Sequence, residues 1–109
     1  MAKSPPSPTA SPGALSSPEI TDLFQAITQL KTVDETAAFF RDLCTIAELK
    51  AMGGRWQMAV LLDQGLHYLE IAQRTGASTA TITRVSNWLR FGSGGYRTML
   101  DRRQRTRAR

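Results

Sequence analysis

The sequence predicts an all-α fold, a compact six-helix domain that contains a helix-turn-helix. Apolar residues recur at helical spacing along most of the chain, and no alternating strand pattern extends beyond a few residues. Two helix-compatible runs, residues 68–74 and 79–91, flank a break that contains Gly76. Two helices joined through so tight a turn cross steeply, so the second can enter a DNA major groove while the first braces it.

Length and composition indicate one domain that follows an N-terminal arm. The chain has 109 residues, and all five prolines fall within the first 18, among many serines. Such a composition cannot bury enough apolar surface to fold. We therefore expect a disordered Pro/Ser-rich arm over residues 1–16, a helix-turn-helix domain over residues 17–102 and a basic tail over residues 103–109. No signal-peptide core and no stretch of roughly 20 apolar residues is present, so a cytoplasmic protein outside the membrane is expected.

Positive charge is concentrated in the second part of the chain. Residues 1–70 hold five Lys/Arg and eight Asp/Glu, a balance of −3, whereas residues 71–109 hold nine Arg and one Asp, a balance of +8. This segregation favours a polyanionic partner, because neutralised phosphates release counterions and supply most non-specific affinity. A solubilising tail is the alternative for the final arginines, but Arg74, Arg84 and Arg90 lie within the two-helix motif.

The first helix is expected to begin at Pro18. Proline is tolerated there because its missing N–H would be unpaired anyway, the Ser17 hydroxyl can cap, and Glu19 lies near the positive end of the helix dipole. The apolar residues then form one wide stripe at helical spacing: Ile20, Leu23, Phe24, Ile27 and Leu30.

Two capping boxes indicate where the second and third helices begin. In each, a Thr hydroxyl accepts from the N–H three residues later, and a Glu at that position returns to the N–H of the cap. Thr32 with Glu35 opens the second helix; Thr45 with Glu48 opens a longer one, which ends at Gly65 as a left-handed stop.

The third helix is expected to turn one apolar face inward: Ile46, Leu49, Met52, Trp56, Ala59 and Leu62. Gly53 and Gly54 each cost about 1 kcal/mol relative to Ala within a helix. The pair therefore indicates close backbone packing or a bend.

Gly76 is the expected turn residue of the helix-turn-helix, because glycine reaches positive φ without steric cost. In the helix that follows, Ile82 and Val85 would pack against Ile71. The outward positions of its first two turns include Thr79, Ala80, Thr81, Thr83 and Arg84. Their hydroxyl, methyl and guanidinium groups suit phosphates and base edges.

A short last helix around Tyr96, Met99 and Leu100 is expected before the arginine tail. The helices over residues 20–30 and 33–43 carry apolar faces that so small a domain can hardly cover alone. We therefore expect a homodimer built on these two helices. A dimer would also suit palindromic DNA, because two reading helices can meet successive turns of the major groove.

Several runs closely resemble the Trp repressor superfamily: Leu62 with Gly65, Glu70-Ile71, Gly76-Ala77, Ala80-Thr81-Ile82-Thr83-Arg84, Ser86-Asn87 and Leu89. Two further runs look like its TrpR-like YerC/YecD family: Phe39-Phe40-Arg41-Asp42-Leu43-Cys44-Thr45-Ile46 and Gly92-Ser93-Gly94-Gly95-Tyr96. The likeness covers residues 19 to about 102. It implies an intertwined all-helical dimer.

The resemblance implies a sequence-specific DNA-binding transcription regulator, a repressor, that inserts the helix beginning near Thr79 into the major groove of double-stranded DNA. The residues expected at the DNA are Tyr68, Ser78, Thr79, Ala80, Thr81, Thr83 and Arg84. Leu69 stands where the repressor has a basic residue, so one contact is expected to be missing and operator preference cannot be copied across.

The repressor also binds L-tryptophan between its core and the reading helix. By resemblance the pocket maps onto Thr45, Arg55 and Arg84, which match, but Val85 and Trp88 replace a glycine and a serine on its far wall. This bulk is expected to exclude a free indole, with Trp88 filling the space from within. We expect no L-tryptophan binding and no cofactor. Four residues remain candidates for binding a different effector: Thr45, Arg55, Arg84 and Trp88.

An enzyme is not expected. His67 lies at a turn, Cys44 has no nearby sequence partner, and no metal-ligand cluster or phosphate-binding glycine loop is present. The alternative function is a basic accessory protein that binds RNA or DNA nonspecifically through its arginine-rich C-terminal end, with the two-helix motif serving only as scaffold.

Overall fold

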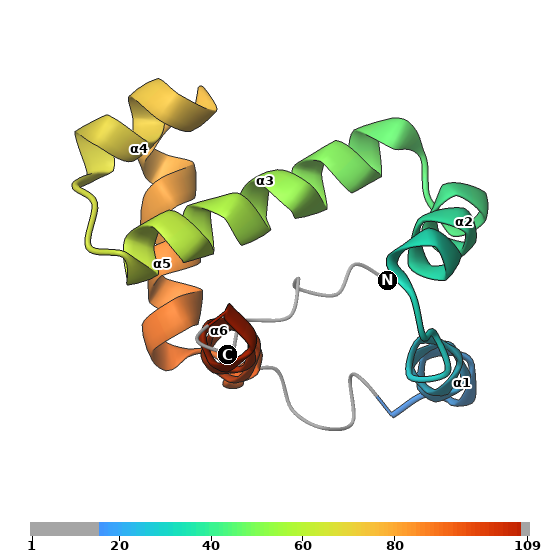
Figure 1. The fold of residues 1–109 in the computed structure, drawn as a ribbon. Coiled ribbons are helices and arrows are strands. Elements are labelled where there is room, and N and C mark those ends of the chain that lie inside the picture. The colour runs from blue at the N-terminus through green and yellow to red at the C-terminus, as the bar shows by residue number, and fades with distance from the viewer. Residues whose placement is uncertain (1–15, 108–109) are drawn as a thin grey trace. The chain divides into compact units, whose positions relative to one another are not determined.

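Helices account for most of the chain that the structure describes. The computed structural model describes residues 16–107, in which it places six α-helices and no strand, so the all-α class is confirmed. The helices are α1 (Pro18–Ile27), α2 (Val33–Leu43), α3 (Ile46–Asp63), α4 (Tyr68–Thr75), α5 (Thr79–Phe91) and α6 (Gly95–Arg107) (Figure 1). Residues 1–15 of the expected arm and the last two residues of the expected tail lie outside this range.

The chain divides into two compact units, residues 1–50 and residues 51–109. The boundary falls inside α3. The N-terminal unit contains α1, α2 and the beginning of α3, and the C-terminal unit contains the remainder of α3 with α4, α5 and α6.

Local caps set the beginnings of α1 and α2. Pro18 begins α1 as predicted, but the predicted Ser17 cap is wrong, because its side chain makes no capping hydrogen bond. At α2, the Thr32 hydroxyl accepts from the Glu35 N–H at 3.0 Å, as predicted. The Glu35 carboxylate accepts from the N–H of Lys31 at 3.0 Å, one residue before the expected donor.

The capping box at the start of α3 is complete. The N–H of Glu48 donates to the Thr45 hydroxyl at 3.1 Å, and the N–H of Thr45 donates to the Glu48 carboxylate at 2.8 Å. The backbone and hydroxyl of Thr45 both stabilise the ionised form of this carboxylate, so they lower the pKa of Glu48. The prediction of a helix beginning after Thr45 is confirmed.

The end of α3 is a Schellman motif around Gly65. The N–H of Leu66 donates to the Leu61 carbonyl at 3.2 Å, and the N–H of Gly65 donates to the Leu62 carbonyl at 3.0 Å. Gly65 has a φ of +86°, so the predicted left-handed stop is confirmed. The motif turns the chain sharply from α3 into α4.

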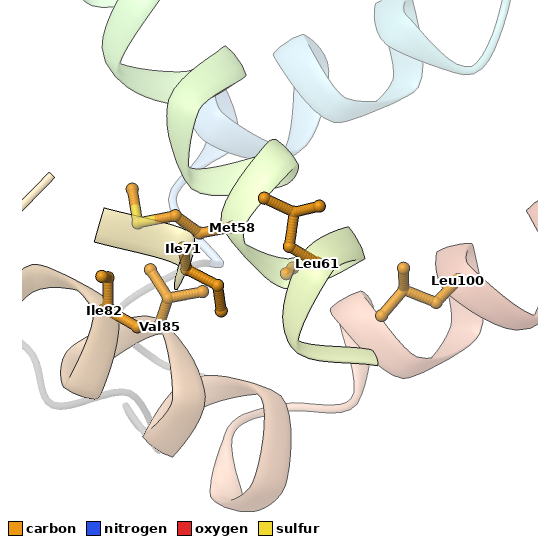
Figure 2. Packing of buried hydrophobic residues seen from close by; sticks show 7 residues of the cluster. Met58, Leu61, Ile71, Ile82, Val85 and Leu100 are labelled. Atoms are coloured by element: carbon orange, nitrogen blue, oxygen red, sulfur yellow. The ribbon is translucent and has the colours of Figure 1, made fainter. Parts of the chain in front are cut away.

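The core of the C-terminal unit gathers side chains from α3, α4, α5 and α6 (Figure 2). Its buried members are Met58, Ala59, Leu61, Ile71, Ile82, Val85 and Leu100. The predicted inner face of α3 is therefore only partly right. Ala59 is buried and Trp56 and Leu62 pack at the edge, but Ile46 is 59% exposed. The core is on the side of Met58 and Leu61, because α4 and α5 pack there.

Within the C-terminal unit, the glycine pair in α3 does not mark close packing. A Cβ placed on Gly53 or Gly54 would meet no atom within 4 Å, and α3 continues through both positions. Of the two expectations for this pair, close backbone contact is wrong within the C-terminal unit.

Neither α1 nor α2 contains a buried residue. Phe24 and Leu43 are each 47% exposed and Val33 is 85% exposed. Phe39 and Phe40 meet edge to face with ring centroids 5.8 Å apart. Large apolar side chains exposed to this extent are frequent on surfaces that meet another protein.

The last helix is longer than predicted. α6 extends over 13 residues to Arg107, so most of the expected arginine tail is helical. Leu100 is 2% exposed, and Tyr96 stacks on Trp56 of α3 with ring centroids 6.4 Å apart. Arg97 pairs with Asp63 of α3 at 2.9 Å and with Asp101 of α6 at 2.9 Å. These contacts hold α6 against the end of α3.

Candidate nucleic-acid interface

The connection between α4 and α5 has the geometry that the sequence predicts. Gly76 has φ +74° and ψ 4°, which is the left-handed region, and its N–H donates to the Ala72 carbonyl at 2.8 Å. The Thr75 hydroxyl donates to the Ile71 carbonyl at 2.7 Å and accepts from the Ala77 N–H at 3.2 Å. The turn thus satisfies its polar groups locally and can hold a fixed angle between the helices.

The beginning of α5 is capped and electropositive. The Ser78 hydroxyl accepts from the Thr81 N–H at 3.2 Å, and the two hydroxyl oxygens lie 3.0 Å apart in a hydrogen bond. The first turn of α5 contains no acidic residue, so no carboxylate neutralises the positive end of the helix dipole. A helix end of this kind favours an approaching phosphate.

One side of α5 is buried against α4 and α3. Ile82, Val85 and Ile71 are fully buried, and their side chains gather beside Met58 (Figure 2). Ser86 is 3% exposed on the same helix. The prediction that Ile82 and Val85 pack against Ile71 is confirmed, so the register of α5 is fixed by its apolar side.

The opposite side of the first turns of α5 is open to solvent. Thr79, Ala80, Thr83 and Arg84 are exposed, as the sequence predicts. Thr81 is half-buried, and its hydroxyl is engaged by the cap.

The remaining residues expected at DNA differ in exposure. Ser78 is the exposed cap of α5, while Tyr68, at the start of α4, is half-buried against the core. Leu69 is 73% exposed beside it. Among the residues expected at DNA, the exposed ones therefore belong to α5 and to its cap.

The arginines of the two-helix motif are not equivalent. Arg74 pairs with Glu70 at 2.9 Å, and both side chains are about half exposed, at 56% and 45%. An exposed pair of this kind contributes little to stability. Arg84 and Arg90 are also exposed, and neither takes part in the ion pairs found within residues 16–107. Their charges are available to a polyanion.

The residues expected around an effector fall in both units. Thr45 belongs to the N-terminal unit, where its hydroxyl and N–H are used in the capping box. Arg55, Arg84 and Trp88 belong to the C-terminal unit. Burial raises the pKa of Tyr96, and the nearby charge of Arg55 opposes that shift.

Trp88 is half-buried, and its indole Nε1 is enclosed without a hydrogen-bond partner in the described chain. Val85, which the resemblance places on the same wall of the pocket, is completely buried.

The contact between Arg97 and Asp63 was not predicted from the sequence, because 34 residues separate the two and no local pattern links them.

A family model described as Trp repressor protein matches residues 18–104, nearly all of the described chain. The chain belongs to this family. It is 43% identical over 88 residues to the uncharacterised protein YerC of Bacillus subtilis (strain 168), a match that spans 81% of this chain and 85% of YerC.

Two crystal structures of the Trp repressor kind are also similar. A TrpR-like protein from Eubacterium eligens has a TM-score of 0.79 and 43% identity, covering 83% of this chain and 93% of its own. A candidate Trp repressor from Staphylococcus aureus has a TM-score of 0.79 and 40% identity, covering 84% and 92%. The predicted resemblance is thereby confirmed.

Membership in the Trp repressor family indicates a DNA-binding regulatory protein rather than an enzyme. Within residues 16–107, no three His, Cys, Asp or Glu side chains are grouped so that they could hold a metal ion. In the same part of the chain, no helix has both the length and the hydropathy needed to cross a bilayer.

Proposed function

We propose that this protein is a sequence-specific transcription regulator, a repressor, that inserts the beginning of α5 into the major groove of double-stranded DNA. The observation that carries the proposal is the division of α5 into two sides. Ile82 and Val85 fix the helix in the core, while Thr79, Ala80 and Thr83 remain exposed. Methyl groups can contact thymine methyls, and hydroxyls can bond to base edges or phosphates.

Charge supports a nucleic-acid partner. Positive potential on α5 comes from the exposed Arg84 and Arg90. It also comes from the first turn of the helix, where no carboxylate offsets the positive end of the helix dipole. Such potential attracts the DNA backbone and positions the helix, whereas the base-contacting side chains give selectivity. The cytoplasmic location expected from the sequence follows from a chromosomal DNA partner.

The proposed regulator acts as an intertwined homodimer. The exposed apolar side chains of α1 and α2, with Phe24, Val33 and Leu43 among them, supply a self-associating surface. Closed two-fold symmetry is the commonest arrangement of such assemblies. It would present two copies of α5 to two half-sites about one helical turn of DNA apart.

The deciding experiment is selection of bound fragments from random and genomic DNA pools with the full chain, followed by binding measurements at several salt concentrations. A shared, roughly two-fold symmetric sequence and a specific affinity well above that for scrambled DNA are expected. A chain that ignores double-stranded DNA even at low ionic strength would overturn the proposal.

The proposed regulator needs no L-tryptophan. By the resemblance, Val85 and Trp88 stand where the repressor has the far wall of its co-repressor pocket; Val85 is fully buried and the indole Nε1 of Trp88 is enclosed. A free indole would need this space. Isothermal titration with L-tryptophan is expected to give no saturable heat in the micromolar range, and micromolar binding would contradict this part of the proposal.

A second function is favoured by α6. Its exposed arginines are held in a helix, so they form a fixed basic surface that could bind RNA or DNA without sequence preference. A double substitution, Arg102→Gln with Arg105→Gln, separates the functions. A sequence-specific regulator keeps its selectivity and loses about 0.9 of salt slope per phosphate contact removed. A nonspecific accessory protein loses most of its binding.

A further inference from the structure

A cavity of about 330 Å³ lies between the last turns of α3 and the C-terminal half of α6. The α3 side contributes Val60, Asp63 and Gln64, spaced so that they share one side of the helix. From α6 come Leu100, Arg103, Gln104 and Arg107, which repeat at the same helical spacing. Two helical stripes thus face each other across the cavity.

The acidic residue of the cavity is engaged by neighbouring side chains of α6. The side chain of Asp63 is 15% exposed, and one of its oxygens accepts from Arg97 at 2.9 Å. The second oxygen lies 3.5 Å from the Gln104 amide nitrogen. These contacts use the negative charge of Asp63 within the helix interface.

The two arginines of the cavity have no such partner. Within residues 16–107, no ion pair or hydrogen bond involves the guanidinium of Arg103 or of Arg107. Being four residues apart, they stand one above the other on α6, with Cβ atoms about 5–6 Å apart. Two like charges at this spacing repel each other, and an anion between them would convert the repulsion into attraction.

The cavity also has an apolar part. Leu100 is 2% exposed and Val60 is partly buried against the core, so the inner wall is hydrocarbon while the arginines are further along α6. A volume of about 330 Å³ is near the lower end of ligand-binding cavities, which span roughly 300–1,000 Å³. The dimensions and chemistry suit a small molecule with one charged group and a short apolar body.

We propose that this cavity binds a small organic anion, with its carboxylate or phosphate group between Arg103 and Arg107 and its apolar body against Val60 and Leu100. None of the residues that line the cavity is among those proposed to contact DNA. None of the cavity residues belongs to the pocket expected for L-tryptophan.

The test is isothermal titration of the full chain with phenyl phosphate, benzoate, inorganic phosphate and phenol. Saturable binding is expected for phenyl phosphate or benzoate, tighter than for inorganic phosphate because the apolar body adds contacts. Phenol is expected to bind more weakly than the anions because it lacks the charged group. No saturable binding of either aromatic anion, or binding of inorganic phosphate that is equally tight, would overturn the site.

Three arginine variants of α6 test whether the anion binds in this cavity. Arg103→Gln and Arg107→Gln should each weaken binding of the aromatic anion by about tenfold or more, since each removes a charge-assisted hydrogen bond. Arg105→Gln removes the same charge from an exposed position of α6 outside the cavity and should change binding by less than about twofold. Equal weakening in all three variants would indicate general charge attraction and refute the site. A chain that binds the anion but not DNA would refute only the proposed function.

Discussion

Two adjacent residues of α5, Ile82 and Thr83, test whether the exposed side of this helix contacts DNA bases. Thr83 is exposed and Ile82 is fully buried, although they are adjacent in sequence. Substitution of Thr83 by Ala removes a hydroxyl and a methyl from the outer side of the helix without opening a cavity. We therefore expect a change of less than about 0.5 kcal/mol in the free energy of unfolding.

The effect on DNA selectivity should be much larger. A lost contact at one base-pair position typically costs about 1–3 kcal/mol, which is roughly a 5- to 150-fold loss of affinity. Thr83→Ala should bind the selected sequence more weakly by about that factor. Its affinity for scrambled DNA should be unchanged, because that affinity depends on phosphate contacts. Fluorescence anisotropy with labelled selected and scrambled duplexes measures both affinities at one salt concentration.

Ile82→Val is the matched control. It removes one buried methylene from the core, so the free energy of unfolding should fall by about 0.5–1.5 kcal/mol while DNA selectivity is retained. Urea denaturation gives the first quantity and the anisotropy assay gives the second. The proposal that the exposed side of α5 contacts bases is refuted if Thr83→Ala distinguishes selected from scrambled DNA as well as the unsubstituted chain does. It is also refuted if Ile82→Val loses as much selectivity as Thr83→Ala.

Three further predictions concern association, the turn and pH. Phe24→Asp should shift the chain to monomers in sedimentation velocity, because Phe24 is apolar and 47% exposed. Gln25→Asp changes an exposed residue of the same helix and should leave the dimer intact. Dimers in both variants would argue against the α1 surface. Gly76→Ala should lower the free energy of unfolding by about 1–2 kcal/mol in urea, since the cost is the positive φ alone and a Cβ would meet no atom within 4 Å; an unchanged value would contradict this. The pKa of Glu48 is lowered from 4.5 by the backbone and hydroxyl of Thr45, so its stabilising effect is present above pH 4.5 and is lost as the pH falls through the folded-state value. The difference in unfolding free energy between the unsubstituted chain and Glu48→Ala should therefore shrink between pH 7 and pH 3, and a constant difference would exclude the ionised cap.

Local signals predicted the helices well where their physical cause is local. The Thr45 and Glu48 capping box and the left-handed Gly65 depend on atoms only a few residues apart, and both were found as expected. The end of α6 was misjudged for the opposite reason. Its extension to Arg107 accompanies the burial of Leu100 and the Arg97 contacts with Asp63, which come from packing against α3.

The candidate site shows the same division. Helical periodicity placed Ile82 and Val85 inside and Thr79, Ala80 and Thr83 outside, because residues three and four apart share a side of a helix. The partial burial of Tyr68 and Thr81 could not be inferred in this way. Burial of a single position depends on which neighbouring helix covers it, and periodicity does not specify that neighbour.

The amino-acid sequence by itself determined the all-α class, most helix beginnings, the positive-φ turn and the sidedness of α5, because each follows from hydrogen bonds or spacing within a few residues. Only the tertiary structure decided which side of α3 enters the core and which charge of α6 is neutralised. It also decided which arginines share a cavity with apolar residues. Those outcomes depend on contacts between segments far apart in the chain, whose positions are fixed by packing of the whole unit rather than by any local pattern.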